Sequence, residues 1–263
     1  MTVTSLTITP LLQDELTSKI HMAIQRIEEH EPSEGYYLAF SGGKDSIVIY
    51  DLAKKAGVKF DPHFSRTTVD PPEILKFIKE NFPEIDWEKP KKSMFQVILS
   101  NSTLPTRSHR ICCRALKEIG GKGRTVITGI RWEESANRRK RQIFHESKNK
   151  KGKWFLNPII DWTTQDVWDY IRRNNLKYCS LYDEGKERIG CILCPFHSLK
   201  DKLDDIQRYP KFVRVYKLTI KKLYNQMKER GRLPKKWTSP EAMWEWWIYG
   251  KVQDHSTRQE EIS

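Results

Sequence analysis

The chain lacks any long hydrophobic run. Among its 263 residues no unbroken apolar stretch reaches the roughly eighteen residues that a membrane-spanning helix needs. The opening segment, MTVTSLTITPLLQDELTSK, also lacks the basic start and apolar run of a secretory signal. We therefore expect a cytoplasmic protein with no membrane partner.

Cysteine is scarce and odd in number. The five cysteines stand at positions 112, 113, 179, 191 and 194. An odd count in a reducing compartment argues against a disulfide framework. The spacing of four of them matters more than their number.

Acidic residues are outnumbered by basic ones. There are 47 Lys and Arg against 34 Asp and Glu, a formal net charge of +13. Such an excess favours polyanionic partners, which include nucleotides, sulfate or phosphate esters and nucleic acid. The 38% of hydrophobic residues, with nine Trp, ten Tyr and ten Phe, provide enough apolar surface for a real core.

Strand patterns alternate with helix patterns through the first two thirds of the chain. Alternation of this kind predicts βαβ units and a doubly wound, mostly parallel α/β sheet, followed here by a helical C-terminal part. We expect one domain over 1–195 that includes the cysteine site and a helical extension over 196–263 packed on it. We expect helices over 11–29, 46–56, 71–81, 163–173, 203–209, 211–230 and 241–249, a helical segment from Glu133, and strands over 36–40, 58–65 and 124–130.

A glycine turn joins the first expected strand to the helix after it. Its sequence is Ser41-Gly42-Gly43-Lys44-Asp45-Ser46. Glycines let the backbone approach a phosphate, and the amides of the turn and of the helix start then point at the anion. The longer GxxxxGK[ST] pattern of the mononucleotide P-loop is absent. The alternative is a capped glycine turn without a ligand.

This turn resembles the signature of the PP-loop ATP pyrophosphatase superfamily, which has an adenine nucleotide alpha hydrolase-like fold. Within it the chain most resembles the phosphoadenosine phosphosulfate reductase family. The resemblance implies that residues 41–46 bind ATP or an adenylyl nucleotide and that Lys44 is catalytic. The segments that carry it are 36–46, Cys112-Cys113, 128–135 with Arg138, 157–162 with 166–168, and 181–183 leading to 190–194.

Four cysteines have the spacing of a metal site. Cys191-x-x-Cys194 lets two thiolates reach one centre, and Cys112-Cys113 lies upstream. The resemblance to adenosine phosphosulfate-reducing enzymes implies that these four hold a [4Fe–4S] cluster. Zinc is the alternative metal, and four buried thiols or a Cys191–Cys194 disulfide are alternatives without metal. We expect Cys179 to be a packing residue.

Several polar residues follow the strand expected at 124–130. Ligands of open α/β sheets bind beyond the carboxyl ends of the strands, so this segment should face the glycine turn. Arginine pairs bidentately with phosphate, which makes Arg131 a second catalytic candidate. The further candidates for nucleotide contact are Gly129, Glu134, Ser135 and Arg138. The segment Thr67–Asp70 follows the second strand and is either a second approach to the nucleotide or an ordinary helix start.

Two further segments bear on nucleic acid. The charged stretch over 138–153 is expected to be an exposed, mobile loop, and it is either simply solvated or follows a nucleic-acid backbone. Trp237, Trp244, Trp246 and Trp247 are expected in a core rather than on a base-stacking surface.

The sequence has no cysteine after Cys194, whereas thioredoxin-dependent sulfonucleotide reductases use a nucleophilic cysteine near the C-terminus. We therefore expect an enzyme that uses ATP and Mg²⁺ to adenylylate a substrate, releasing pyrophosphate, for sulfur transfer of the nucleic-acid thiolation or phosphorothioation type. The alternatives are an APS or PAPS reductase with a non-standard thiol and a non-catalytic nucleotide- or nucleic-acid-binding regulator. A sulfur donor protein or thiol reductant, nucleic acid and a homo-oligomer of undetermined order are the expected partners.

Overall fold

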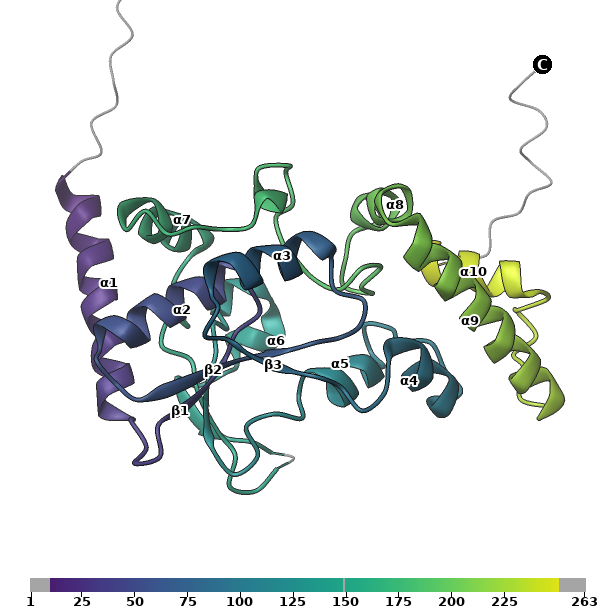
Figure 1. Cartoon of the computed structure of the whole chain (residues 1–263), viewed down its shortest axis with the longest axis horizontal. Coiled ribbons are helices and arrows are strands. Elements are labelled where there is room, and N and C mark those ends of the chain that lie inside the picture. Colours follow the sequence, from purple (N-terminus) through teal and green to yellow (C-terminus); the bar gives the residue numbers. More distant parts are fainter. Residues whose placement is uncertain (1–9, 149, 251–263) are drawn as a thin grey trace, which may run out of the picture. The chain divides into compact units, whose positions relative to one another are not determined.

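The computed structural model describes residues 10–148 and 150–250. Packing divides this part of the chain into two units (Figure 1). The sheet unit comprises residues 10–65, 73–88 and 120–185, and the helical unit comprises 66–72, 89–119 and 186–250. The domain boundary expected after residue 195 stays a prediction.

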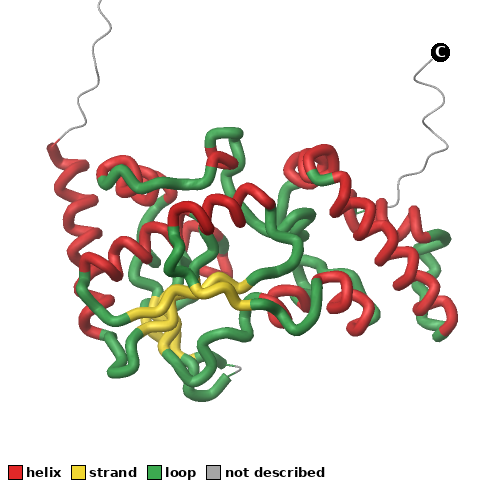
Figure 2. The backbone as a smooth tube through the Cα atoms, in the orientation of Figure 1, coloured by secondary structure: helices red, strands yellow, loops and turns green. Residues whose placement is uncertain are grey.

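The sheet unit is built on a mostly parallel sheet. Its described strands run in the order β3-β2-β1-β4-β6-β5, and every neighbouring pair is parallel except β5 with β6. This confirms the predicted α/β fold. Figure 2 shows the strands in yellow, gathered in one region of the chain. The strands are β1 (Tyr36–Ala39), β2 (Phe60–Ser65), β3 (Asp86–Glu88), β4 (Thr125–Ile127), β5 (Phe144–Glu146) and β6 (Trp154–Leu156).

Helices cover this sheet and contact one another, α1 with α2 and α2 with α7. The central strand β1 is buried along its length because it lies between β2 and β4, and Tyr36 and Leu38 are fully inaccessible to solvent. The helices of this unit are α1 (Pro10–Glu29), α2 (Lys44–Lys55), α3 (Pro72–Asn81), α6 (Ala136–Arg139) and α7 (Thr164–Arg173), with 3-10 turns η1 (Trp132–Glu134) and η2 (Ser180–Tyr182).

The helical unit has a hydrophobic core of its own. The core joins α4, α5, α9 and α10, and it includes Trp237 and Trp247, with Trp244 and Trp246 packed against it. The tryptophans are thus core residues, as predicted. The helices are α4 (Met94–Asn101), α5 (Ile111–Leu116), α8 (Leu199–Arg208), α9 (Pro210–Glu229) and α10 (Pro240–Tyr249).

Two strands and two α-helices were not predicted from the sequence, and one prediction was wrong. Strands β3 and β6 and helices α4 and α5 are too short to show a clear period. The stretch 138–153, predicted as a loop, contains β5, which pairs antiparallel with β6. A strand of three residues inside a charged segment is too short to be predicted from its sequence pattern. Strand β5 is therefore recognised only by its pairing with β6. None of the helices in the described ranges is long and apolar enough to cross a membrane.

Candidate functional site

The glycine turn lies where β1 ends and α2 begins, as the sequence predicts. Gly42 has φ +72°, a left-handed conformation that favours glycine. A side chain there would also crowd Ile74, whose Cδ1 would lie 2.8 Å from the added Cβ. Gly43 is the extended N-cap residue of α2, and its carbonyl accepts hydrogen bonds from the Ser46 amide (3.0 Å) and the Ser46 hydroxyl (2.8 Å).

Serine side chains fix the shape of this turn. The Ser41 hydroxyl donates to Ser46 Oγ at 3.1 Å and accepts from the Gly43 amide at 3.3 Å. The Ser41 amide also donates to Ser46 Oγ, at 3.2 Å. Ser46 therefore ties both ends of the turn together, and the first turn of α2 stands at its mouth, where the helix dipole favours an anion.

Lys44 and Arg131 share one carboxylate. Lys44 is only 6% exposed, and its Nζ lies 3.3 Å from Asp45 Oδ2. Arg131 is 2% exposed, and its Nε donates to Asp45 Oδ1 at 2.7 Å. The longer Lys44 contact is the weaker one, because charge-assisted hydrogen bonds are normally shorter than 3 Å. Lys44 is therefore bound less tightly to Asp45 than Arg131 is.

Arg131 is held by several further partners. Its Nη1 donates to Glu133 Oε2 at 2.8 Å and to the Trp162 carbonyl at 3.3 Å, and its Nη2 donates to Thr164 Oγ1 at 3.2 Å. Burial raises the pKa of Glu133, but hydrogen bonds from Thr164 and Arg131 outweigh it, so the pKa lies below its usual value. The guanidinium thus connects α2 to the start of α7, and the phosphate contact expected of Arg131 stays a prediction.

The other predicted residues after β4 lie around this network. Gly129 packs directly on Asp45, since a Cβ on Gly129 would come within 3.0 Å of the Asp45 backbone. Glu134 accepts from the Arg131 amide at 2.9 Å and forms an ion pair with Arg138. Ser135 caps α6. Gly129 is thus brought to the turn directly, and Glu134 through Arg131, while ligand contact by any of the four stays a prediction.

Tyr182 is a residue at this turn that the sequence analysis did not assign. Its hydroxyl accepts a hydrogen bond from the Lys44 amide at 3.0 Å, and its ring centroid lies 5.7 Å from Lys44 Nζ. The ring packs edge-on against Trp168, with centroids 5.1 Å apart. The segment 181–183 was noted only as part of the family pattern, because nothing in a Leu-Tyr-Asp triplet indicates a partner 138 residues away.

The four predicted metal-binding cysteines all belong to the helical unit. Cys112 and Cys113 lie in α5, and Cys191 and Cys194 lie in the segment before α8. Cys191 belongs to the core of this unit, and Cys112 and Cys194 pack against that core. A hydrogen bond with Cys113 and burial raise the pKa of Cys112, and the charges of Cys113, Cys191 and Cys194 add to this. The fold therefore brings together two pairs that are far apart in the sequence.

The backbone around Cys191–Cys194 is held by buried polar groups. Leu193 has φ +56°, and its amide donates to Asp205 Oδ2 at 2.8 Å. The Cys191 thiol donates to Thr67 Oγ1 at 3.4 Å, and the Thr67 hydroxyl donates to Asp70 Oδ1 at 2.6 Å. The segment Thr67–Asp70, considered above for the nucleotide, is thus a support of the cysteine segment. Asp205 carried no motif that marks this role.

Cations lie among the thiols. A hydrogen bond from Cys112 and the guanidinium of Arg110 outweigh the effect of burial and lower the pKa of Cys113 to about 5. The negative charge that Cys191 carries when it is ionised raises the pKa of Lys117, a residue exposed to solvent. Burial raises the pKa of Cys191. The donor chemistry fits a thiolate-bound metal.

The arrangement of the side chains does not by itself define a metal site. In the part of the chain that the structure describes, no group of three or more His, Cys, Asp or Glu side chains is placed to hold a metal ion. The predicted iron–sulfur or zinc site is therefore not confirmed. Cys179 lies apart from the four in the sheet unit, with 1% of its surface exposed.

Comparison with known families decides the family. The model of the phosphoadenosine phosphosulfate reductase domain matches residues 35–197, which contain both the glycine turn and the four cysteines. The chain belongs to this family. The resemblance read from the five sequence segments is thus confirmed, together with the PP-loop nucleotide-binding fold.

The relatives that this chain resembles carry different names, and one of them is named as a reductase. An adenosine 5'-phosphosulfate reductase of Oceanobacillus iheyensis is 32% identical over 171 residues, covering 59% of this chain and 69% of that protein. An uncharacterized protein of Methanocaldococcus jannaschii is 33% identical over 193 residues, covering 69% of this chain. The chain spans only 47% of the length of that archaeal protein.

A solved structure supports the fold. The FMN adenylyltransferase of Candida glabrata in complex with ATP aligns with a TM-score of 0.51 at 14% identity, covering 72% of this chain and 65% of that one. At this identity the likeness speaks for the fold alone.

Proposed function

We propose that this member of the phosphoadenosine phosphosulfate reductase family is a PP-loop enzyme that binds ATP, adenylylates a substrate and so prepares it for sulfur transfer. A substrate oxygen attacks the α-phosphorus, the bond to the bridging oxygen of the β-phosphate breaks, and pyrophosphate leaves. A sulfur donor then displaces AMP from the activated position. The substrate class we favour is nucleic acid, as in base thiolation or backbone phosphorothioation.

The observation that supports this proposal is the burial of Lys44 and its weak contact with Asp45. The side chain is 6% exposed, adjoins the left-handed glycine turn and has a 3.3 Å contact to Asp45 that a phosphate can replace. The chemistry demands mainly neutralisation of the charge that builds up on the departing pyrophosphate. Lys44 and the α2 amides are suited to that task, with Mg²⁺ bound largely through the phosphates.

Other residues of the turn act on Lys44. Arg131 holds Asp45 in place at 2.7 Å, so the carboxylate keeps its position when Lys44 turns to the phosphate. Tyr182 Oη accepts from the Lys44 amide, which a phosphate oxygen would also use. Nucleotide binding therefore involves an exchange of Tyr182 for phosphate at this amide.

The test is pyrophosphate release by the anaerobically purified protein with Mg-ATP and, separately, a pool of unmodified tRNA or DNA. We expect release that Lys44→Ala lowers by at least a hundredfold, since loss of one charged transition-state contact costs about 3 kcal/mol. The matched control is Lys54→Ala, an exposed lysine of the same helix paired with Glu84. Equal release by wild type and Lys44→Ala would contradict the proposal.

The relation to adenosine 5'-phosphosulfate reductases supports a second candidate, a sulfonucleotide reductase. Such a reaction needs an accessible thiol that attacks the sulfur of adenylyl sulfate, displaces AMP and forms a thiosulfonate, from which a second thiol releases sulfite as a disulfide forms. Cys179, the fifth cysteine beside the two pairs, is 1% exposed and is therefore shielded from substrate. Sulfite formed from adenylyl sulfate with a dithiol, and lost in Cys179→Ser, would favour the reductase over adenylylation.

We further propose that Cys112, Cys113, Cys191 and Cys194 hold a [4Fe–4S] cluster, with zinc as the alternative. Such a cluster would supply structural crosslinking or one-electron chemistry. Anaerobic protein should be brown, with four irons per chain, and Cys112→Ser should bleach it, whereas Cys179→Ser should not. Colourless protein with stoichiometric zinc would replace iron in this proposal, and protein with neither metal would overturn it.

A further inference from the structure

The C-terminal helices carry most of the excess positive charge. Between residues 211 and 236 there are ten Lys and Arg and a single acidic residue, Glu229, a net charge of +9 out of +13 for the whole chain. Helix α9 and the turn after it provide all ten. A concentration of charge this local attracts a polyanion to one surface of the helical unit.

Four of these cations form one stripe. Arg214, Lys217, Lys221 and Lys228 follow at intervals of three, four and seven residues, which places them on one side of an α-helix. All four are exposed, and none has an ion-pair partner among the described residues. From the first to the last the stripe spans about 21 Å, which matches roughly six nucleotides at the rise of a B-form strand.

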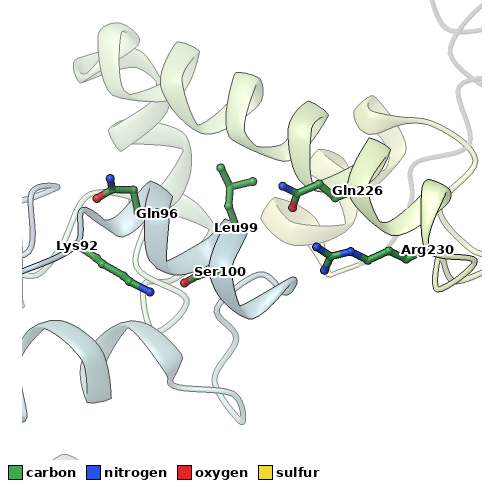
Figure 3. Close-up of a pocket in the computed structure, with 6 residues that line it drawn as sticks. All are labelled: Lys92, Gln96, Leu99, Ser100, Gln226 and Arg230. Atoms are coloured by element: carbon green, nitrogen blue, oxygen red, sulfur yellow. The ribbon is translucent and has the colours of Figure 1, made fainter.

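A polar pocket adjoins the C-terminal end of this helix. It has a volume of about 470 Å³ and is shown in Figure 3. It shares no residue with the glycine turn or with the four cysteines of the candidate metal site. Its lining residues are Lys92, Gln96, Leu99, Ser100, Gln226 and Arg230.

The pocket groups suit a phosphodiester. Lys92 and Arg230 supply positive charge, and Arg230 Nη1 is already oriented by a 2.9 Å hydrogen bond to Ser102 Oγ. Gln96 and Gln226 also line the pocket, and the N–H groups of their side-chain amides can donate to phosphate oxygens. Two cations with amide and hydroxyl groups are the usual partners of phosphate and sugar oxygens.

We propose that the stripe on α9 binds the sugar–phosphate backbone of a nucleic acid. The α4–α9 pocket contacts a separate part of the same strand, since Gln226 and Arg230 lie about half a turn around the helix from the stripe. An anionic membrane would need a free apolar face beside the cations. Most apolar side chains of α9 are instead packed in the core, including Val213, Tyr216 and Ile220, and the large apolar residues that α9 exposes are the two side chains Val215 and Leu218. The proposal goes beyond adenylylation and does not depend on it, since binding needs no ATP.

The test is fluorescence anisotropy of labelled 20-nucleotide probes (single-stranded DNA, its duplex, and RNA of the same sequence) titrated with the full chain from 50 to 300 mM KCl, without nucleotide. Wild type should bind at least one probe, with log Kd rising steeply against log salt. The variant R214A/K217A/K221A/K228A should bind at least tenfold more weakly at 100 mM KCl, with a salt slope lower by about four. Lys92→Ala should lower that slope by about one.

The matched control removes four exposed cations elsewhere, in R139A/K140A/K148A/K151A, and should leave Kd within about threefold. If this control loses binding while the α9 variant keeps it, the other charged segment is the binding surface and the proposal fails. Binding to phosphatidylserine vesicles but to no probe overturns it in favour of a membrane.

A second measurement needs no variant. Lysine acylation of wild-type protein with and without saturating probe should show protection of Lys217, Lys221 and Lys228 relative to Lys148 and Lys151. Equal labelling of both sets would overturn the proposal even if the α9 variant failed to fold. Because these assays omit ATP, failure here is separate from failure of pyrophosphate release.

Discussion

At the scale of single residues, the main feature of the site is that Arg131 and Lys44 both contact the carboxylate of Asp45. Asp45 accepts from Arg131 at 2.7 Å and from Lys44 at 3.3 Å. Arg131 also bonds Glu133, Thr164 and the Trp162 carbonyl, so it is committed to the fold. Lys44 keeps the freedom that a ligand contact requires.

Arg131→Met tests this division of roles. Removing a buried guanidinium leaves Asp45 and the Trp162 carbonyl without their partner, so we expect the free energy of unfolding to fall by about 3 kcal/mol. Urea unfolding measures it. Arg138→Met, which breaks the local ion pair with Glu134 on a less buried side chain, should cost less than about 1 kcal/mol. Equal losses in the two variants would show that Arg131 is no more structural than Arg138.

At the scale of elements, α7 begins with a capping box that also joins α1. Thr163 Oγ1 accepts from the Asp166 amide at 3.0 Å, and Asp166 Oδ2 accepts from the Thr163 amide at 2.7 Å. Lys19 of α1 donates to the same carboxylate at 2.9 Å. Burial raises the pKa of Asp166, but these hydrogen bonds outweigh it and the pKa lies below its usual value.

The lowered pKa predicts a pH dependence. A carboxylate with a depressed folded pKa stabilises the fold above its unfolded pKa, about 3.9, and this contribution is lost as the pH falls through the folded value. Asp166→Asn should therefore be less stable than wild type at pH 7, with the gap closing below about pH 4. Urea unfolding at pH 7, 5 and 3.5 checks this, and a gap independent of pH would contradict it.

At the scale of the whole molecule, the two candidate sites belong to different units. The sheet unit contains the glycine turn, Arg131 and Tyr182. The helical unit contains the four cysteines, Thr67 and Asp205. Each site is supported by its own core. The two ligands should therefore stabilise different parts of the chain.

Amide hydrogen exchange can separate these effects. Mg-ATP should slow exchange over 40–50 and 125–135 by at least several-fold, because binding orders the turn and the residues behind it. Removing iron from the anaerobic protein should speed exchange over 66–72, 111–117 and 190–194. Mass-spectrometric exchange at matched times measures both. A single ligand that changes both sets equally would contradict independent support of the two sites.

The sequence by itself determined the family, the parallel sheet and the position of the glycine turn. Each of these follows from local pattern: an apolar strand, Ser41–Ser46 at its end, and a helix after it. Long helices such as α1 and α9 were placed to within a residue or so for the same reason, since about five turns of periodic side chains give a strong signal.

Only the tertiary structure decided which side chains act together. The hydroxyl of Tyr182 meets the Lys44 amide across 138 residues, Asp205 holds the backbone at Leu193, and Thr67 contacts Cys191 across 124. Strand β5 exists because β6 pairs with it. Contacts of this kind join residues that are far apart in the sequence and depend on how the elements pack, which the local sequence pattern does not specify. The sequence therefore predicted the chemistry of the groups, and the fold determined their partners.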